Sequence, residues 1–132
     1  MSAEMAVQAA VVAALRAALG GDVSGVFDGP PARAACPYVA IDDGQSGDWS
    51  SKTGRGREHR LAIRLADDGT SAARLHGLIA RSVTAIEAIP QALPGHRIAS
   101  LVFLRQRVAR TARGPWAGLI EFRIRTAEQT EA

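Results

Sequence analysis

Apolar residues recur at helical spacing in two segments of the chain. The first runs from residue 4 to about residue 19, where Gly20-Gly21 ends it, and its stripe is rich in alanine. The second runs to about Glu87 and has a stripe of larger apolar side chains. Both segments are predicted to be helices, and the first should pack closely on a flat surface. The stripes consist of Val7, Val11, Ala14, Leu15 and Ala18, and of Leu75, Leu78, Ile79, Ser82, Val83 and Ile86.

Other segments alternate between apolar and polar residues, which is typical of strands with one buried face. The clearest runs from Arg57 to Asp67, where Leu61, Ile63 and Leu65 share one face and the arginines lie on the other. Because the segment is amphipathic, one face should contact the core and the other solvent or a partner. Further strands are predicted at residues 26–27, 37–42, 98–108 and 116–125.

The order of these elements predicts an α+β fold. A mainly antiparallel sheet of about four to five strands should pack with two helices. No internal repeat, low-complexity segment or linker interrupts the chain, so we expect one domain over residues 1–132.

The segment GDWSSKTGRGREHRLAIRL leads into the clearest strand. Its first part belongs to residues 43–56, which are rich in glycine and polar side chains and predict a long loop. Trp49 lies inside this loop. A tryptophan in such a place either folds back onto the core or anchors into a neighbouring molecule, and the sequence leaves both possibilities open.

Composition adds modest constraints. The formal net charge is +3 and the only lysine is Lys52, so the chain is mildly basic and rich in arginine. This charge permits contact with DNA or an acidic protein surface but does not require it. The chain has one cysteine, no signal-peptide pattern and no apolar run of about 20 residues that would span a membrane. We therefore expect a protein made in the cytoplasm.

Arginines gather in two of the predicted strands and in the turn between the last two strands. If these strands pair, they form a basic face that meets phosphates or an acidic protein ring, or that is merely solvated. Aromatic residues for stacking single-stranded nucleic acid are lacking, apart from Trp49. The face would comprise Arg60, Arg64, Arg105, Arg107, Arg110 and Arg113.

Catalytic and cofactor signatures are weak. The histidines do not have metal-ligand spacing, and the glycine-rich loop lacks the order of a phosphate-binding loop and precedes a strand. Asp42 and Asp43 could serve as an acid–base pair with His59, but a turn-forming role is the simpler interpretation. We expect no cofactor, no metal and no enzymatic activity.

The order of several short sequence segments along the chain resembles that in a known protein family. The most specific segments are Cys36-Pro37-Tyr38-Val39, the loop DWSSKT from Asp48 to Thr53, and Glu58-His59 leading into a strand. "VFDGPP", "LPGHRIASLVFLRQRVARTARG" and the closing strand follow the same order. The chain resembles the tail-completion, or tail-terminator, proteins of long-tailed phages and phage-like gene transfer agents. Cys36 departs from the larger apolar residue more common there.

The resemblance implies a structural role. Such proteins form a ring, usually hexameric, at the head-proximal end of the tail tube; the ring ends tube polymerisation and joins the tail to the head connector. DNA later passes through its centre, and no membrane is involved. The protein would be cytoplasmic during assembly and then part of the tail. The loop would supply the interface, through Asp48, Trp49, Lys52, Arg55 and Arg57.

Two other functions remain open on the sequence. A small basic nucleic-acid-binding module would use the arginine-rich face, and its DNA affinity would fall steeply with salt. A small enzyme would use Asp42, Asp43 and His59.

Overall fold

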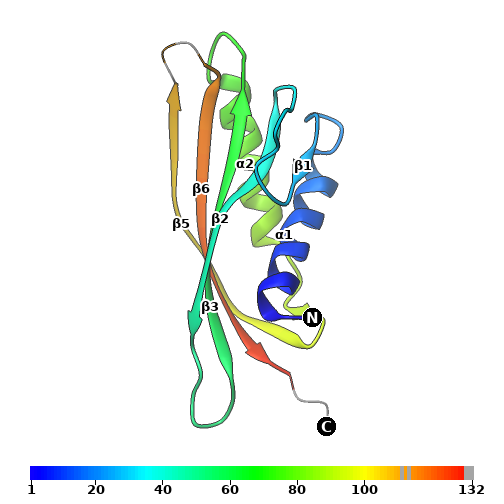
Figure 1. Ribbon diagram of the computed structural model, residues 1–132, viewed down its shortest axis with the longest axis vertical. Helices are drawn as coiled ribbons and strands as arrows, with labels where there is room; N and C mark the ends of the chain where they lie inside the picture. Colours follow the sequence, from blue (N-terminus) through cyan, green and yellow to red (C-terminus); the bar gives the residue numbers. More distant parts are fainter. Residues whose placement is uncertain (111, 113, 130–132) are drawn as a thin grey trace.

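The computed structural model describes residues 1–110, 112 and 114–129. These residues form two helices and six strands, and the strands make a single curled sheet (Figure 1). The elements are, in order, α1 (Ala3–Leu19), β1 (Val26–Phe27), β2 (Tyr38–Asp48), β3 (Gly56–Asp67), α2 (Ala73–Glu87), β4 (Ala92–Leu93), β5 (His96–Arg110) and β6 (Trp116–Glu128).

The α+β class, both helices and the mainly antiparallel sheet are confirmed, but the predicted count of four to five strands is one strand too low. The strand order is β1-β2-β3-β6-β5-β4, and β1 pairs in parallel with β2 while every other pair is antiparallel. The sheet therefore has six strands and is mainly antiparallel, with β1 as the one parallel addition in the described residues. β4 was missed because two residues are too short to show an alternating pattern.

Both helices lie on the same face of the sheet (Figure 1). α2 contacts the central strands directly, and α1 packs on α2 and β1. The close approach of α2 depends on Gly118 of β6, because a Cβ there would lie 2.8 Å from Cδ1 of Ile79. The core forms between these layers, with Ile63, Ile120 and Phe122 fully buried at 0% exposure. Burial of these apolar side chains is the main source of stability.

Residues 43–56 do not form the long loop that the sequence predicts. β2 and β3 continue as a regular hairpin out to the pair Asp48 and Arg57, leaving only residues 49–55 in the turn. A shift in register between Ile41 and Asp43 marks a bulge where the alternation breaks. The sequence did not predict this part of β2 because its glycine, serine and other polar residues lack apolar alternation. Its pairing depends on backbone hydrogen bonds with β3.

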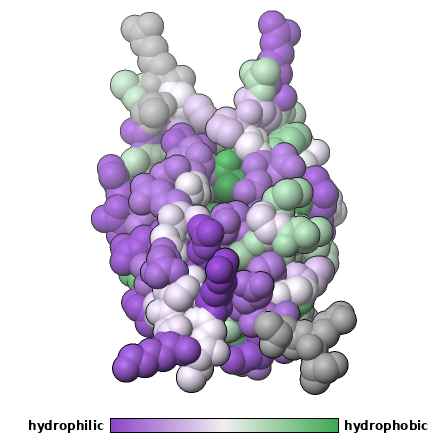
Figure 2. All heavy atoms as spheres, turned by 60° about the horizontal axis from the view of Figure 1, so that its bottom comes forward, coloured by the Kyte–Doolittle hydropathy of each residue, from purple (hydrophilic) through white to green (hydrophobic). Residues whose placement is uncertain are grey.

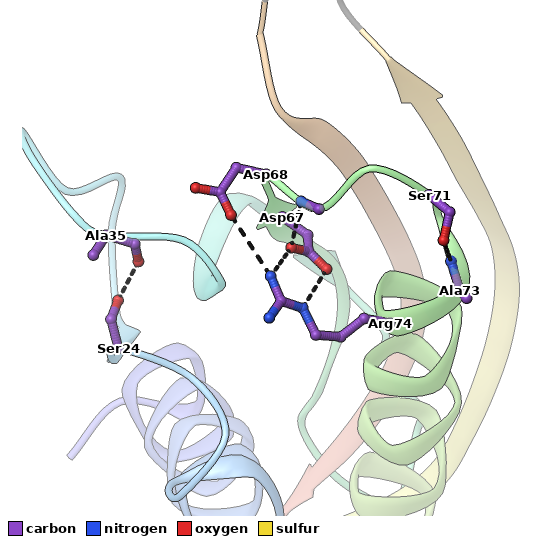
Figure 3. Close-up of polar contacts among 8 residues, drawn as sticks. Ser24, Ala35, Asp67, Asp68, Ser71, Ala73 and Arg74 are labelled. Atoms are coloured by element: carbon purple, nitrogen blue, oxygen red, sulfur yellow. Dashed lines mark hydrogen bonds and ion pairs between the residues drawn. The ribbon is translucent and has the colours of Figure 1, made fainter.

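A buried carboxylate organises the turn between β3 and α2 (Figure 3). Asp67 is fully buried and accepts hydrogen bonds from the Arg74 guanidinium and from the Gly69 amide at 3.1 Å. Hydrogen bonding from Arg74 holds the pKa of Asp67 below its usual value. The N-cap of α2 is Ala72, which has no side-chain cap, while Ser71 accepts from the Ala73 amide at 3.3 Å. The pair of Asp67 with Arg74 therefore anchors the first turn of α2 to the sheet.

Candidate assembly interface

The β2–β3 hairpin extends beyond both helices, at the bottom of Figure 1. Its turn is closed by hydrogen bonds from the Trp49 amide to the Gly56 carbonyl and from the Ser51 amide to the Gly54 carbonyl, both at 2.9 Å. Gly56 sits where no side chain fits, because a Cβ would lie 2.6 Å from the Trp49 oxygen and 2.9 Å from the Trp49 ring. The end of the hairpin therefore has a defined shape and projects from the body of the protein.

Trp49 contacts a neighbouring strand of its own chain and stays partly exposed. Its ring lies 5.4 Å from the guanidinium carbon of Arg125, and it still keeps 39% of its surface exposed. Arg125 in turn donates to Glu58 at 3.0 Å, and this hydrogen bond lowers the pKa of Glu58. The tryptophan is thus positioned by a neighbouring strand while a large part of the ring remains available.

The partners of Trp49 could not be read from the sequence. Arg125 and Glu58 lie far apart along the chain and meet because they are opposite each other in the β3–β6 register. The available signal was that both residues occupy polar positions of alternating strands. Only the register, which the sequence does not reveal, brings them beside the hairpin turn.

The remaining predicted interface residues lie on the same hairpin. Lys52 and Arg55 are exposed and form no ion pair within the described residues, and Arg57 lies 4.0 Å from Glu4 of α1. Asp48 accepts a hydrogen bond from the Ser50 hydroxyl at 2.6 Å. A hollow of about 400 Å³ separates the hairpin from the start of α1, lined in part by Asp48, Arg55 and Arg57. Figure 2, which turns this end of the molecule forward, shows a largely hydrophilic surface.

The predicted basic face is only partly free. Arg60 and Arg64 alternate with the buried Leu61, Ile63 and Leu65, so they lie on the face of the sheet that does not pack on the helices. Arg64 pairs with Asp42 at 2.9 Å, and Arg105 makes a two-point contact with Glu121 at 2.6 and 3.1 Å. Arg110 instead stacks over Trp116 at 5.3 Å. Of the other members, Arg60 and Arg107 form no ion pair within the described residues, and Arg113 lies outside them.

The hypothesis of an acid–base site at Asp42, Asp43 and His59 is wrong. His59 is 2% exposed on the helix-covered side, where its Nε2 lies 2.9 Å from the Thr126 hydroxyl. Burial lowers its pKa. Asp42 instead binds Arg64 on the other side of the sheet. The three side chains are therefore not brought together.

In residues 1–110, 112 and 114–129, no three histidine, cysteine or acidic residues cluster closely enough to hold a metal ion. Within the same ranges, neither helix is long and apolar enough to cross a membrane.

The helices cover one face of the sheet, and the protruding hairpin carries a half-exposed tryptophan, an arrangement suited to contact with other proteins. Comparison with known families makes this specific. The model of the family "Tail completion protein gp17" matches residues 4–127, and the chain belongs to this family. It is therefore a structural protein of phage or phage-like tails.

Two solved structures are similar over most of the chain. One is a chain of the virion of a native gene transfer agent particle, with 28% identity, a TM-score of 0.71, and coverage of 96% of this chain and 98% of that one. The other is the gp17 protein of bacteriophage SPP1, with 26% identity, a TM-score of 0.62, and coverage of 92% and 89%. No curated protein sequence matches the chain.

Proposed function

We propose that this protein forms a ring at the head-proximal end of a tail tube, where it ends tube polymerisation and joins the tail to the head connector. The observation that carries the proposal is the family match over residues 4–127. The similarity to a chain of a gene transfer agent virion, over 96% of this chain, supports a place in such a particle. Residues 1–132 act as one domain, which assembles in the cytoplasm and then becomes part of the tail.

The hairpin supplies the contact in this proposal. A ring requires heterologous contacts, in which one patch meets a different patch on the next molecule. Trp49 serves as the apolar anchor, because its half-exposed ring is already held by Arg125 and loses little conformational freedom on binding. Lys52, Arg55 and Arg57 pair with acidic groups of the neighbouring subunit, the tube or the connector, and Asp48 holds the base of the turn.

In this proposal the protein has a purely structural role. DNA passes through the ring without sequence-specific binding, and neither a cofactor nor catalysis is involved. Support comes from the open face of the sheet, where Asp42 and Glu121 each neutralise an arginine and thereby weaken attraction to phosphates. A wall that bound DNA tightly would impede its passage.

The test is whether the protein caps tubes assembled from the tail-tube protein of the same particle. We expect end-capping that limits tube length, and we expect Trp49→Ala to abolish it while the monomer stays folded. Met5→Ala is the matched control, since it removes another exposed apolar side chain, 63% exposed, from α1. Tube ends capped equally well by the Trp49→Ala variant would contradict the role of the hairpin.

A further inference from the structure

The sheet has two edges that are only partly covered. β1 pairs with β2 only at Val39 and Ala40, and β4 pairs with β5 only at His96 and Arg97. Beyond these pairs, residues 41–48 of β2 and 99–110 of β5 have no strand on their outer side in the part of the chain that the structure describes. We call these segments the β2 edge and the β5 edge. Free edges of this length are templates for pairing with another strand.

The two edges carry opposite charge. The β2 edge contains Asp42, Asp43 and Asp48 and no basic residue, whereas the β5 edge contains three arginines and no acidic residue. Asp42 and Arg105 are engaged within the chain, with Arg64 and Glu121. Asp43 and Arg107 form no ion pair within the described residues, so their charges are available to a partner. The three arginines are Arg105, Arg107 and Arg110.

The β5 edge also exposes a continuous apolar run. Val102, Phe103 and Leu104 are 37%, 36% and 36% exposed, beside a register shift between Phe103 and Arg105. Phe103 packs edge-on against Phe122 at 5.7 Å and so continues the core outward. Three consecutive apolar side chains exposed on an edge strand favour aggregation unless a partner covers them.

We propose that the β2 edge of one copy pairs with the β5 edge of the next copy, so that the sheets join side by side around the ring. The inference rests on the proposed function and adds a contact between subunits of the ring to the one made by the hairpin. Like charges oppose β2–β2 and β5–β5 pairing, and opposite charges favour β2–β5 pairing. The contact is therefore heterologous, as a closed ring requires.

The topology also sets the direction of this pairing. β2 is antiparallel to β3, β3 to β6, and β6 to β5, so β2 and β5 run in opposite directions within one molecule. Rotation about an axis roughly along the strands preserves these directions. The ladder between neighbouring copies is therefore antiparallel, the arrangement in which cross-strand side chains lie directly opposite each other.

Charge reversal tests the inference. Asp43→Arg places a positive charge on the β2 edge, where it faces the arginines of the β5 edge, and Arg107→Glu places a negative charge on the β5 edge, where it faces the aspartates of the β2 edge. We expect each variant alone to self-associate about tenfold more weakly than the wild type. The double variant, or an equimolar mixture of the two single variants, should return to within about threefold of the wild type. Native mass spectrometry over a concentration series would measure association in solution, and electron microscopy would measure occupancy of tail-tube ends.

Two variants control for charge alone. Arg33→Glu makes the same change as Arg107→Glu at an exposed position in the segment between β1 and β2. Asp28→Arg makes the same change as Asp43→Arg in the segment after β1. Both controls should associate like the wild type.

The outcomes separate this inference from the proposed function. If the wild type forms rings on tube ends and both charge-reversal variants form them equally well, the edge pairing would be overturned and the proposed function would stand. Loss of tube binding without recovery in the mixture would also overturn it, because the edges would then contact the tube protein instead of a second copy. A wild type that does not bind tube ends would contradict the proposed function, yet recovery of self-association in solution would still support the edge pairing. If the wild type self-associates neither in solution nor on tube ends, the edge pairing and the proposed function would both be overturned.

Discussion

The two faces of the central sheet differ in their side chains: one is apolar and buried, and the other carries ion pairs. On β6, Ile120, Phe122 and Ile124 point toward the helices and are at most 1% exposed. The alternate positions, Glu121 and Arg125, point the other way and form ion pairs with neighbouring strands. Exposed or half-exposed ion pairs contribute little to stability, whereas each buried side chain contributes up to about 3 kcal/mol. The helix-covered face therefore holds the fold together, and the open face and its edges are free to make contacts.

The largest effect should come from the core of the covered face. Phe122→Ala should lower the free energy of unfolding by about 3–5 kcal/mol, because it empties a fully buried aromatic site. Leu119→Ala, three residues earlier on the open face, should cost below about 1.5 kcal/mol because Leu119 is only half-buried. Urea unfolding of both variants measures the difference, and equal losses would break the contrast between the faces.

A smaller effect should follow from the two aspartates that bind arginine on opposite sides. Asp67→Asn should cost about 1–3 kcal/mol, because the carboxylate is fully buried beside Arg74. Asp42→Asn should cost about 1 kcal/mol or less, because its partner Arg64 is largely exposed. Thermal or urea unfolding at pH 7 compares them. A larger loss for Asp42→Asn would show that the open face contributes more to stability than we infer.

The buried histidine should make stability depend on pH. Burial holds the pKa of His59 below its ordinary value of 6.5, so below that value the unfolded chain binds a proton that the folded chain resists. Stability from the neutral ring is thus present above pH 6.5 and is lost as the pH falls toward the folded pKa. Urea unfolding at pH 7 and pH 5 should show this loss in the wild type and not in His59→Gln. His76→Gln, at an exposed helical position, should behave like the wild type.

The smallest effect on stability should come from the hairpin. Trp49→Ala should change the free energy of unfolding by about 1 kcal/mol or less, because the ring is partly exposed and contacts Arg125 at the surface. Its effect on assembly should nevertheless be complete. A loss of several kcal/mol would mean that the hairpin is part of the core, and its effect on assembly would then reflect unfolding.

Sequence reasoning succeeded where side-chain pattern determines structure. The stripe of α2 and the alternation of Leu61, Ile63 and Leu65 predicted their elements because those side chains face the core. It failed where the backbone determines structure, as in residues 43–48, whose strand depends on pairing with β3. The predicted interface residues Trp49 and Lys52 do lie on one projecting turn, but the contact of Trp49 with Arg125 depends on a register that no local pattern encodes.

The most direct test of a role in tail completion is the mass of the purified protein by light scattering, alone and with the tail-tube protein of its particle. The account predicts a ring, formed either in solution or only on the tubes. A strict monomer that ignores the tubes and binds duplex DNA with a steep salt dependence would contradict it, and the function would then lie on the arginine-rich face.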